Sequence, residues 1–176
     1  MMEEQVILVD TEDREIGSME KMEAHRKGVL HRAFSVFIFN TKGDMLLQKR
    51  AAEKYHSAGL WTNACCSHPR PGEATEAAAT RRLREELNFS VPIRKVFDFT
   101  YRAEFSNGLI EHEFDHVFFG EFDGWVKFNP SEVSDYCYMS LEEVKESVAL
   151  SPNKFTEWFR IVLPEIEKQI KTGALG

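Results

Sequence analysis

The segment Ser67–Phe89, SHPRPGEATEAAATRRLREELNF, joins a turn rich in proline and glycine to a stretch that is free of both. This second part, Ala74–Leu87, contains mainly alanine and charged residues, which favour an α-helix. Ala79, Leu83 and Leu87 recur at four-residue spacing, so we expect them to share the buried face of that helix. The segment therefore predicts a turn followed by one amphipathic helix.

Short β-prone runs lie on both sides of this helix. The runs at 33–40 and 45–49, with the turn TKGD between them, predict a hairpin. Ser140 is a typical capping residue for a helix from Leu141, and a last helix is expected over Asn153–Lys171 with a kink at Pro164. Further strands are expected at 6–9, 61–66, 96–105, 110–122 and 133–139.

This order of elements predicts an α+β fold. Strands followed by single helices, mostly joined by antiparallel turns, are typical of an αβα sandwich with a mixed, mostly antiparallel sheet. A chain of 176 residues can bury a hydrophobic core without disulfide bonds. No stretch rich in proline, glycine or serine divides the sequence, so we expect one domain over residues 1–176.

The composition excludes several classes of protein. The 29 acidic residues outnumber the 22 basic ones, and the net charge of −7 argues against a duplex nucleic-acid partner, although a local basic cluster can still bind a small anion. Three cysteines do not make a disulfide framework, and reduced thiols indicate a cytoplasmic protein. No apolar run is long enough to span a membrane, so no membrane partner is expected. The sequence makes no prediction of an oligomeric state.

Imidazole and carboxylate side chains suggest a metal site formed by distant parts of the chain. Glu111 and Glu113 are two residues apart on an expected strand, so their side chains point to one face. With His25, His31 and His68 they would suit an octahedral divalent ion such as Mn²⁺, Zn²⁺ or Mg²⁺. The simpler alternative is that these are unconnected surface residues.

Three other histidines are not expected in this site. His112 and His116 face the opposite side of the strand that carries Glu111 and Glu113, because side chains alternate along a strand. His56 lies in an expected loop, where a surface position is the ordinary case.

Cys66 is a candidate proton-transfer group. It lies two residues before His68, so both side chains share a face if the segment is extended, and a thiol can act as an acid or a base. Cys65 then faces the core, and Cys137, on a later strand, is expected to pack in the sheet. The alternative for Cys66 is a buried structural cysteine.

Charged residues on and near the helix allow two interpretations. Glu85 follows Arg81 by four positions, and Glu86 follows Arg82 in the same way, which is typical of a solvated helix with ion pairs. Alternatively, a carboxylate of this helix holds a Mg²⁺ ion on a diphosphate. The basic residues Lys21, Arg50, Lys54 and Arg82 could bind phosphate oxygens, and Tyr101 and Trp158 are candidate pocket aromatics.

Several of these stretches occur together in a known family. The runs LHRAFSVFIFN at 30–40 and WTNACCSHP at 61–69, the helix at 81–87 and the Glu111–Glu113 triplet follow one another in family order. From about Lys21 to Trp158 the chain resembles the type I isopentenyl-diphosphate Δ-isomerases, a branch of the Nudix superfamily. The segment at 61–69 is the specific part, since the helix also serves many Nudix hydrolases.

The general Nudix pattern, G-x₅-E-x₇-R-E-U-x-E-E-x-G-U, can be aligned with the opening segment. The matching residues are Glu73, Arg81, Leu83, Glu85 and Glu86. Ser67, Arg82 and Asn88 replace Gly, Glu and Gly. The loss of one helix carboxylate to Arg82 favours the isomerase branch over pyrophosphate hydrolysis.

The resemblance implies interconversion of isopentenyl diphosphate and dimethylallyl diphosphate by protonation and deprotonation of a C₅ skeleton. It implies Cys66 and Glu113 as opposed acid/base groups, with Tyr101 beside Glu113. It also implies one divalent ion (Mn²⁺, Zn²⁺ or Mg²⁺) on the three histidines and two glutamates, and a Mg²⁺ ion that joins Glu86 to the diphosphate. The implied substrate-binding residues are Lys21, Arg50, Lys54, Ser67, Arg82 and Trp158, of which Trp158 offers a π-face to a tertiary cation.

Two other functions remain as alternatives. A Nudix hydrolase that cleaves a nucleoside diphosphate linkage would use the helix carboxylates but not Cys66. A non-catalytic module that binds a diphosphate or a protein would leave the metal ligands without a role.

Overall fold

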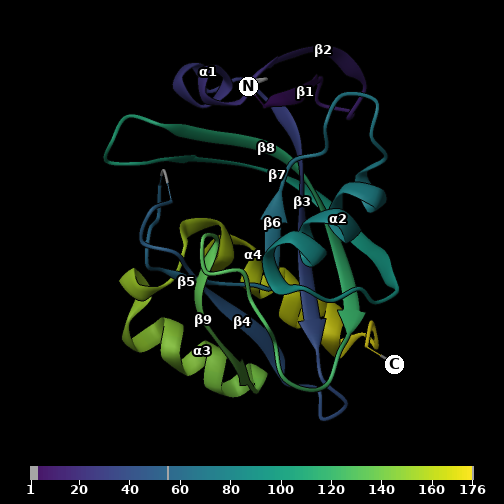
Figure 1. The fold of residues 1–176 in the computed structure, drawn as a ribbon, viewed down its shortest axis with the longest axis vertical. Coiled ribbons are helices and arrows are strands. Elements are labelled where there is room, and N and C mark those ends of the chain that lie inside the picture. The colour runs from purple at the N-terminus through teal and green to yellow at the C-terminus, as the bar shows by residue number, and fades with distance from the viewer. Residues whose placement is uncertain (1–3, 55, 176) are drawn as a thin grey trace.

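The computed structural model describes residues 4–54 and 56–175 (Figure 1). Its strands are β1 (Gln5–Val9), β2 (Glu15–Glu20), β3 (His31–Phe39), β4 (Met45–Arg50), β5 (Trp61–Thr62), β6 (Cys65–Ser67), β7 (Ile93–Glu104), β8 (Ile110–Glu121) and β9 (Val133–Met139). Its helices are α1 (Lys21–Lys27), α2 (Thr75–Leu87), α3 (Leu141–Leu150) and α4 (Glu157–Lys171), with a 3₁₀ turn at Pro152–Lys154. The mixed, mostly antiparallel sheet and the helices confirm the predicted α+β fold.

The expected hairpin between β3 and β4 is limited to its turn. The two strands pair at Phe39 and Met45 and then diverge. Strand β4 continues against β9, whereas β3 pairs in parallel with β8, from His31 opposite Glu113 to Phe39 opposite Glu121. Two candidate metal ligands that are 82 positions apart in sequence are therefore strand neighbours.

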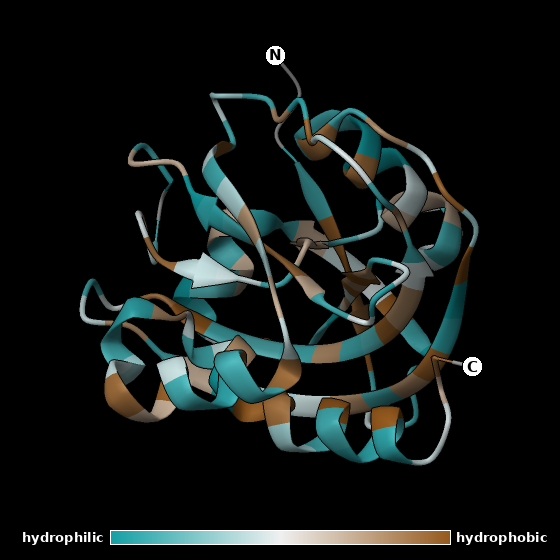
Figure 2. Ribbon diagram, turned by 90° about the horizontal axis from the view of Figure 1, so that it is seen from below, coloured by the Kyte–Doolittle hydropathy of each residue, from teal (hydrophilic) through white to brown (hydrophobic). Residues whose placement is uncertain are grey.

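Helices cover both faces of the sheet, as Figure 2 shows in a view along its layers. Alternate residues of β3 enter two separate cores, because successive side chains of a strand point to opposite faces. One core contains Phe34, Val36 and Ile38 of β3 with Ala79, Leu83 and Leu87 of α2, which confirms the predicted buried face of this helix. The other core contains Phe37 and Phe39 of β3 with Phe159, Val162 and Ile166 of α4.

The N-terminal elements β2 and α1 were not expected from the sequence. Strand β2 is a mostly exposed edge strand, so it lacks the apolar alternation that marks a half-buried strand. Helix α1 has only seven residues and ends at Gly28, whose φ of 68° is in the left-handed region that glycine adopts easily. This short helix carries His25.

Two other boundaries differ from expectation. The segment predicted as one extended stretch at 61–66 is divided into β5 and β6, because the buried side chain of Asn63 donates hydrogen bonds to the carbonyls of Val36 and Cys65. The last helix begins at Glu157 and not near Asn153, since a 3₁₀ turn and the N-cap Thr156 precede it. The predicted capping box of α3 is confirmed: Glu143 N–H donates to Ser140 Oγ, and Ser140 N–H donates to the Glu143 side chain. None of the described helices is long and apolar enough to cross a membrane.

Candidate active site

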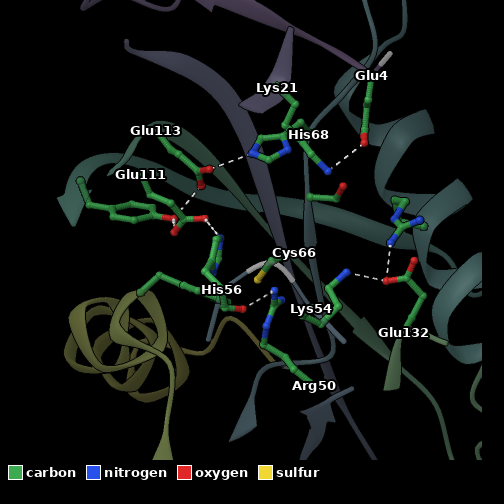
Figure 3. A pocket seen from close by; sticks show the side chains of 14 residues that line it. Glu4, Lys21, Arg50, Lys54, His56, Cys66, His68, Glu111, Glu113 and Glu132 are labelled. Carbon is green, nitrogen blue, oxygen red and sulfur yellow. Dashed lines mark hydrogen bonds and ion pairs between the residues drawn. The ribbon is translucent and has the colours of Figure 1, made fainter. Parts of the chain in front are cut away.

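One pocket collects most of the residues singled out in the sequence (Figure 3). Figure 3 shows Glu111 and Glu113 on one side of it and Lys54 with Glu132 on the other, with Cys66 between them, while Lys21 lies beside His68. The described lining residues are Glu4, Lys21, Arg50, Lys54, His56, Cys66, Ser67, His68, Arg82, Tyr101, Glu111, Glu113, Glu132 and Trp158. All six predicted substrate-binding residues and all three predicted catalytic residues are in this set.

Strand β8 supplies the two carboxylates of the predicted metal site. Glu111 and Glu113 are both about 5% exposed and both line the pocket, as the two-residue spacing predicts. His112, between them, points to the other face, where its Nδ1 lies 3.1 Å from the Gly28 carbonyl. His116 is likewise away from the pocket, with its Nε2 2.9 Å from Asp13 Oδ2.

Three imidazoles surround Glu113. Its Oε2 is 2.8 Å from His68 Nε2 and 3.2 Å from His31 Nε2. The rings of His25, His31 and His68 have centroids 4.9 to 5.6 Å apart. Ligand atoms of these four buried residues all lie within 4.8 Å of one another. The fold therefore gathers four of the five predicted ligands of the His/Glu site into one cluster.

Backbone carbonyls orient two of these rings. His25 Nδ1 is 2.7 Å from the Lys21 carbonyl, and His31 Nδ1 is 2.8 Å from the Val29 carbonyl. A carbonyl accepts only an N–H, so each ring donates Nδ1–H to its carbonyl and turns Nε2 toward the cluster, where that nitrogen can offer a lone pair to a metal ion. Lone pairs and carboxylates that converge in a buried space suit a divalent cation, and this second-layer support is typical of metal sites.

His56 also belongs to the pocket, so the expectation that it is an ordinary loop residue was wrong. It is about 5% exposed, and its Nε2 is 3.2 Å from Glu111 Oε2. His25, His56 and Glu111 form a second buried group with ligand atoms within 4.8 Å of one another. Nothing in the sequence around His56 marked it, because the loop reaches Glu111 only through the fold.

Tyr101 links the two carboxylates. Its hydroxyl is 2.6 Å from Glu113 Oε1 and 2.9 Å from Glu111 Oε1, and its single proton can be donated to one of them at a time. Burial, together with these carboxylates, raises the pKa of Tyr101 well above its usual value. Tyr101 is therefore a neutral hydrogen-bond donor at the centre of the site.

The charge state of Glu113 results from opposing effects. Burial alone would raise its pKa, but His68 and His31 outweigh burial and hold the pKa well below its ordinary value. Glu113 is thus an anion at neutral pH, which is the form that binds a cation.

The two adjacent cysteines point in different directions, as predicted. Cys65 is fully buried in the core beneath α2, where its Sγ donates to Glu86 Oε2 at 3.1 Å. Cys66 lines the pocket and packs against Tyr101 and Trp158. Burial, with a further contribution from the nearby Asp115, raises the pKa of the Cys66 thiol above its ordinary value, so Cys66 carries its proton at neutral pH.

Two buried side chains that the sequence analysis missed orient Cys66. Its Sγ is 3.2 Å from Asn63 Oδ1 and 3.5 Å from Ser35 Oγ. Ser35 donates its own proton to Asp115 Oδ2 at 2.6 Å, and Asn63 uses both N–H groups on backbone carbonyls. Both neighbours therefore present lone pairs to the thiol. Asn63 lies in the motif TNACC, but only the break between β5 and β6 brings its oxygen to Cys66.

Two basic residues of the pocket are paired with carboxylates. Lys21 Nζ is 3.0 Å from Glu4 Oε2, and Lys54 Nζ is 2.6 Å from Glu132 Oε2. Such pairs hold the cations at the pocket wall, where an incoming anion can exchange with the carboxylates.

The position of Glu86 bears on the predicted Mg²⁺ site. Its carboxylate accepts from Gln48 and Cys65 and is 3.2 Å from Arg82. Glu86 is buried and lies outside the described residues that line the pocket, whereas its partner Arg82 is one of them. A Mg²⁺ ion on Glu86 stays a prediction. It requires Arg82 to move away from Glu86 so that the carboxylate can reach the diphosphate.

Trp158, near the start of α4, forms part of the pocket wall. The ring is about 3% exposed, and the guanidinium of Arg50 lies 5.2 Å from its centroid. A cation already rests against this ring, which is the type of contact that a π-face stabilises.

Comparison with known proteins identifies the class to which this site belongs. The NUDIX domain model matches residues 29–159. The structure resembles the crystal structure of DR0079 from Deinococcus radiodurans, with a TM-score of 0.75 and 21% identity over 90% of this chain and 97% of that one. It also resembles a MutT protein from Methanosarcina mazei Go1, with a TM-score of 0.66 and 20% identity over 81% and 96% of the two chains. The chain belongs to the NUDIX family.

Sequence relatives place it more narrowly within that family. The chain is 52% identical over 168 residues to isopentenyl-diphosphate Delta-isomerase 2 of Photorhabdus laumondii, with 96% of this chain and 95% of the relative covered. It is 51% identical over 162 residues to isopentenyl-diphosphate Delta-isomerase of Pectobacterium atrosepticum, with coverage of 92% and 90%. It therefore belongs to the isopentenyl-diphosphate Delta-isomerase branch, as the resemblance in the sequence predicts.

Proposed function

We propose that this protein interconverts isopentenyl diphosphate and dimethylallyl diphosphate. The observation that carries the proposal is the joint presence, in one pocket, of a thiol on β6 and a carboxylate on β8, beside a wall of basic residues. A 1,3-allylic shift needs two proton-transfer groups and an anchor for a diphosphate that does not react.

The anchor is assigned to the basic wall. Lys21, Arg50, Lys54 and Arg82 line the pocket together with Ser67. Charge-assisted hydrogen bonds from these groups would hold the diphosphate and place the C₅ chain between Cys66 and Glu113. Because the diphosphate stays intact, its binding energy serves only to position the reacting carbons.

The histidine cluster is assigned to a divalent ion. His25, His31, His68 and Glu113 would hold it, and Glu111 is the fifth predicted ligand. When bound, the ion would supply positive charge that offsets the buried carboxylates and makes a neighbouring acid stronger. The donor set accepts Mn²⁺, Zn²⁺ or Mg²⁺. A Mg²⁺ ion on the diphosphate, held by Glu86, remains part of the proposal.

Two side chains of this chain move the protons. One of Cys66 Sγ and the Glu113 carboxylate gives a proton to the terminal alkene carbon, and the other removes a proton from C2. The roles are exchanged in the reverse direction. Tyr101 holds Glu113 by a hydrogen bond, and Asn63 holds the thiol. Trp158 and Tyr101 are both nearly fully buried, so their rings exclude the water that would trap a tertiary cation.

The hydrolase alternative is less well supported by the geometry. A pyrophosphate hydrolase needs carboxylates of the Nudix pattern that are free to bind metal, whereas Glu73, just before α2, and Glu85 are paired with Arg81. The remaining carboxylate, Glu86, is turned toward the core. A non-catalytic module would leave both the thiol and the histidine cluster without a role.

A single reaction in D₂O tests the proposal. The protein is incubated with isopentenyl diphosphate and Mg²⁺, and the products are analysed by mass spectrometry and by a phosphate assay. The expected result is dimethylallyl diphosphate that contains deuterium, without released phosphate. Released phosphate without deuterium would favour the hydrolase, and an unchanged substrate would favour the binding module.

In this proposal the binding partner is a small C₅ diphosphate. The three free cysteines support a reducing, cytoplasmic location.

A further inference from the structure

The loop between β4 and β5 brings His56 to the metal side of the pocket. Its backbone is tied to the neighbouring strand: the Arg50 guanidinium donates to the His56 carbonyl at 3.2 Å, and Gly59 N–H donates to the Arg50 carbonyl at 3.1 Å. These two hydrogen bonds to Arg50 of β4 therefore hold the loop, and His56 with it, in a defined position.

Aromatic contacts fix the orientation of the His56 ring. The ring is stacked on Phe105, with centroids 4.5 Å apart and an angle of 10° between the planes. Its edge meets Trp158 at a centroid distance of 5.6 Å. Because these contacts fix the ring, its Nε2 points toward Glu111, and Nε2 lies 3.2 Å from Glu111 Oε2.

Glu111 needs such a support. Its carboxylate lies outside the tight group formed by His25, His31, His68 and Glu113, although it lines the same pocket. One oxygen accepts from Tyr101, and the other faces His56. Ligating carboxylates are commonly held by hydrogen bonds from a second layer of residues, which set the direction of the remaining lone pairs.

We propose that His56 is a positioning residue that donates Nε2–H to Glu111 Oε2 and so holds this carboxylate against the histidine cluster. The Ser57 hydroxyl, 3.2 Å from His56 Nδ1, can donate to that nitrogen and so select the tautomer with the proton on Nε2. The same ring supports Trp158, so the metal side of the pocket and the wall assigned to the C₅ unit share one residue. The second part of this inference rests on the proposed function, whereas the first does not.

The alternative is that His56 is itself a metal ligand, with His25 and Glu111 as its partners. A glutamine at position 56 separates the two roles. Its amide N–H can donate to Glu111 from nearly the place of Nε2, but an amide is a poor replacement for imidazole as a ligand. A leucine fills a similar volume against Phe105 and Trp158 and has no donor.

The test measures binding of Mn²⁺ alone, by competition with a chelator, in the full-length chain. His56→Leu should weaken binding by about 10- to 100-fold, the usual effect of losing a second-layer partner. His56→Gln should stay within about threefold of the unchanged protein, because one hydrogen bond of similar geometry remains. The matched control is His112→Leu, on the opposite face of β8, which should leave Mn²⁺ affinity unchanged.

A double substitution identifies the residue through which His56 acts. In a Glu111→Ala background, His56→Leu should cause no further loss of Mn²⁺ affinity, because the supported carboxylate is gone. An equal loss in the His56→Gln and His56→Leu proteins, or an additive loss in the double variant, would overturn the proposal. Unchanged affinity in His56→Leu would do the same. Metal binding is read without substrate, so a failed isomerase assay and a failed role for His56 are distinguishable.

Discussion

Strand β8 and the region of helix α2 both carry several carboxylates, but the side chains that surround these carboxylates differ. On α2 and just before it, Glu73 and Glu85 are matched by Arg81, and Glu85 and Glu86 by Arg82, in ion pairs of 2.8 to 3.2 Å. On β8, Glu111 and Glu113 are nearly fully buried and face imidazoles and a tyrosine hydroxyl.

The difference supports our placing of the proposed chemistry on the sheet and not on the helix of this NUDIX protein. A carboxylate with a nearby guanidinium is neutralised by the protein itself and mainly supports local structure. A buried carboxylate without a guanidinium needs a metal ion or a proton, so its surroundings are available for catalysis. The ion-paired carboxylates of the family helix thus mainly support structure, whereas the sheet face between β8 and β6 carries the groups that we propose for proton transfer.

The strongest test of this comparison is the loss of Cys66. Cys66→Ala should reduce kcat by at least about 10²- to 10⁴-fold, because general acid–base groups contribute about that much. Thermal unfolding and metal content should be retained, since the side chain is small and lies at the pocket wall. Cys65→Ala and Cys137→Ala are the controls and should keep nearly all of kcat. An active Cys66→Ala enzyme would break the assignment of catalysis to the sheet while leaving the fold assignment intact.

Removal of a cluster ligand should have the next largest effect. His68→Ala should weaken binding of the divalent ion by at least about 10- to 100-fold and lower kcat in parallel, since loss of a ligand costs no less than loss of its support. Elemental analysis of the purified protein and steady-state kinetics measure the two effects. Glu85→Gln on α2 is the comparison, and its metal content should not change. Full metal content in the His68→Ala protein would contradict the site.

The basic wall should affect substrate binding more than chemistry. Lys54→Ala should raise KM for isopentenyl diphosphate by about tenfold or more, the value of one charge-assisted hydrogen bond, with a smaller loss of kcat. Lys171 has a similar ion pair, 2.6 Å from Glu167, but lies at the end of α4, so Lys171→Ala should leave both constants unchanged. Equal KM values in the two variants would remove Lys54 from the anchor.

The smallest effect is expected at the ion pair between Glu73, just before α2, and Arg81 of that helix, as a pH-dependent change of stability. The hydrogen bond from Arg81 holds the pKa of Glu73 below the ordinary 4.5, and burial opposes it only partly. The pair therefore stabilises the fold above pH 4.5, and this contribution disappears as pH falls through the lowered pKa. Because the pair is partly exposed, Glu73→Gln should cost less than about 1 kcal/mol at pH 7.

Urea unfolding at pH 7 and near pH 3 measures this difference, with Glu76→Gln, an exposed position in the first turn of α2, as the control. The gap between Glu73→Gln and the unchanged protein should narrow at the lower pH. A loss of several kcal/mol, or a gap that persists in acid, would mean that α2 carries more than surface ion pairs and would weaken the contrast with β8.

Much of this protein follows from the sequence alone. Runs of β-prone residues bounded by turn residues predicted most strands, and the four-residue spacing of apolar residues predicted the buried face of α2, because both patterns follow from backbone geometry. The two-residue spacing of Glu111 and Glu113 was enough to place both carboxylates on one side of β8. The motif at 61–69 indicated the isomerase branch, since few families share that run of residues.

Other features were decided by tertiary structure. The parallel pairing of β3 with β8 brings His31 to Glu113, and no local pattern encodes which distant strands become neighbours. His56 contacts Glu111, and Asn63 contacts Cys66, through a loop and a strand break whose course depends on the rest of the fold. Local periodicity reports only which face of an element a side chain occupies. The partner that meets this face is chosen by the packing of the whole chain, because burial of apolar surface, which drives that packing, is non-directional.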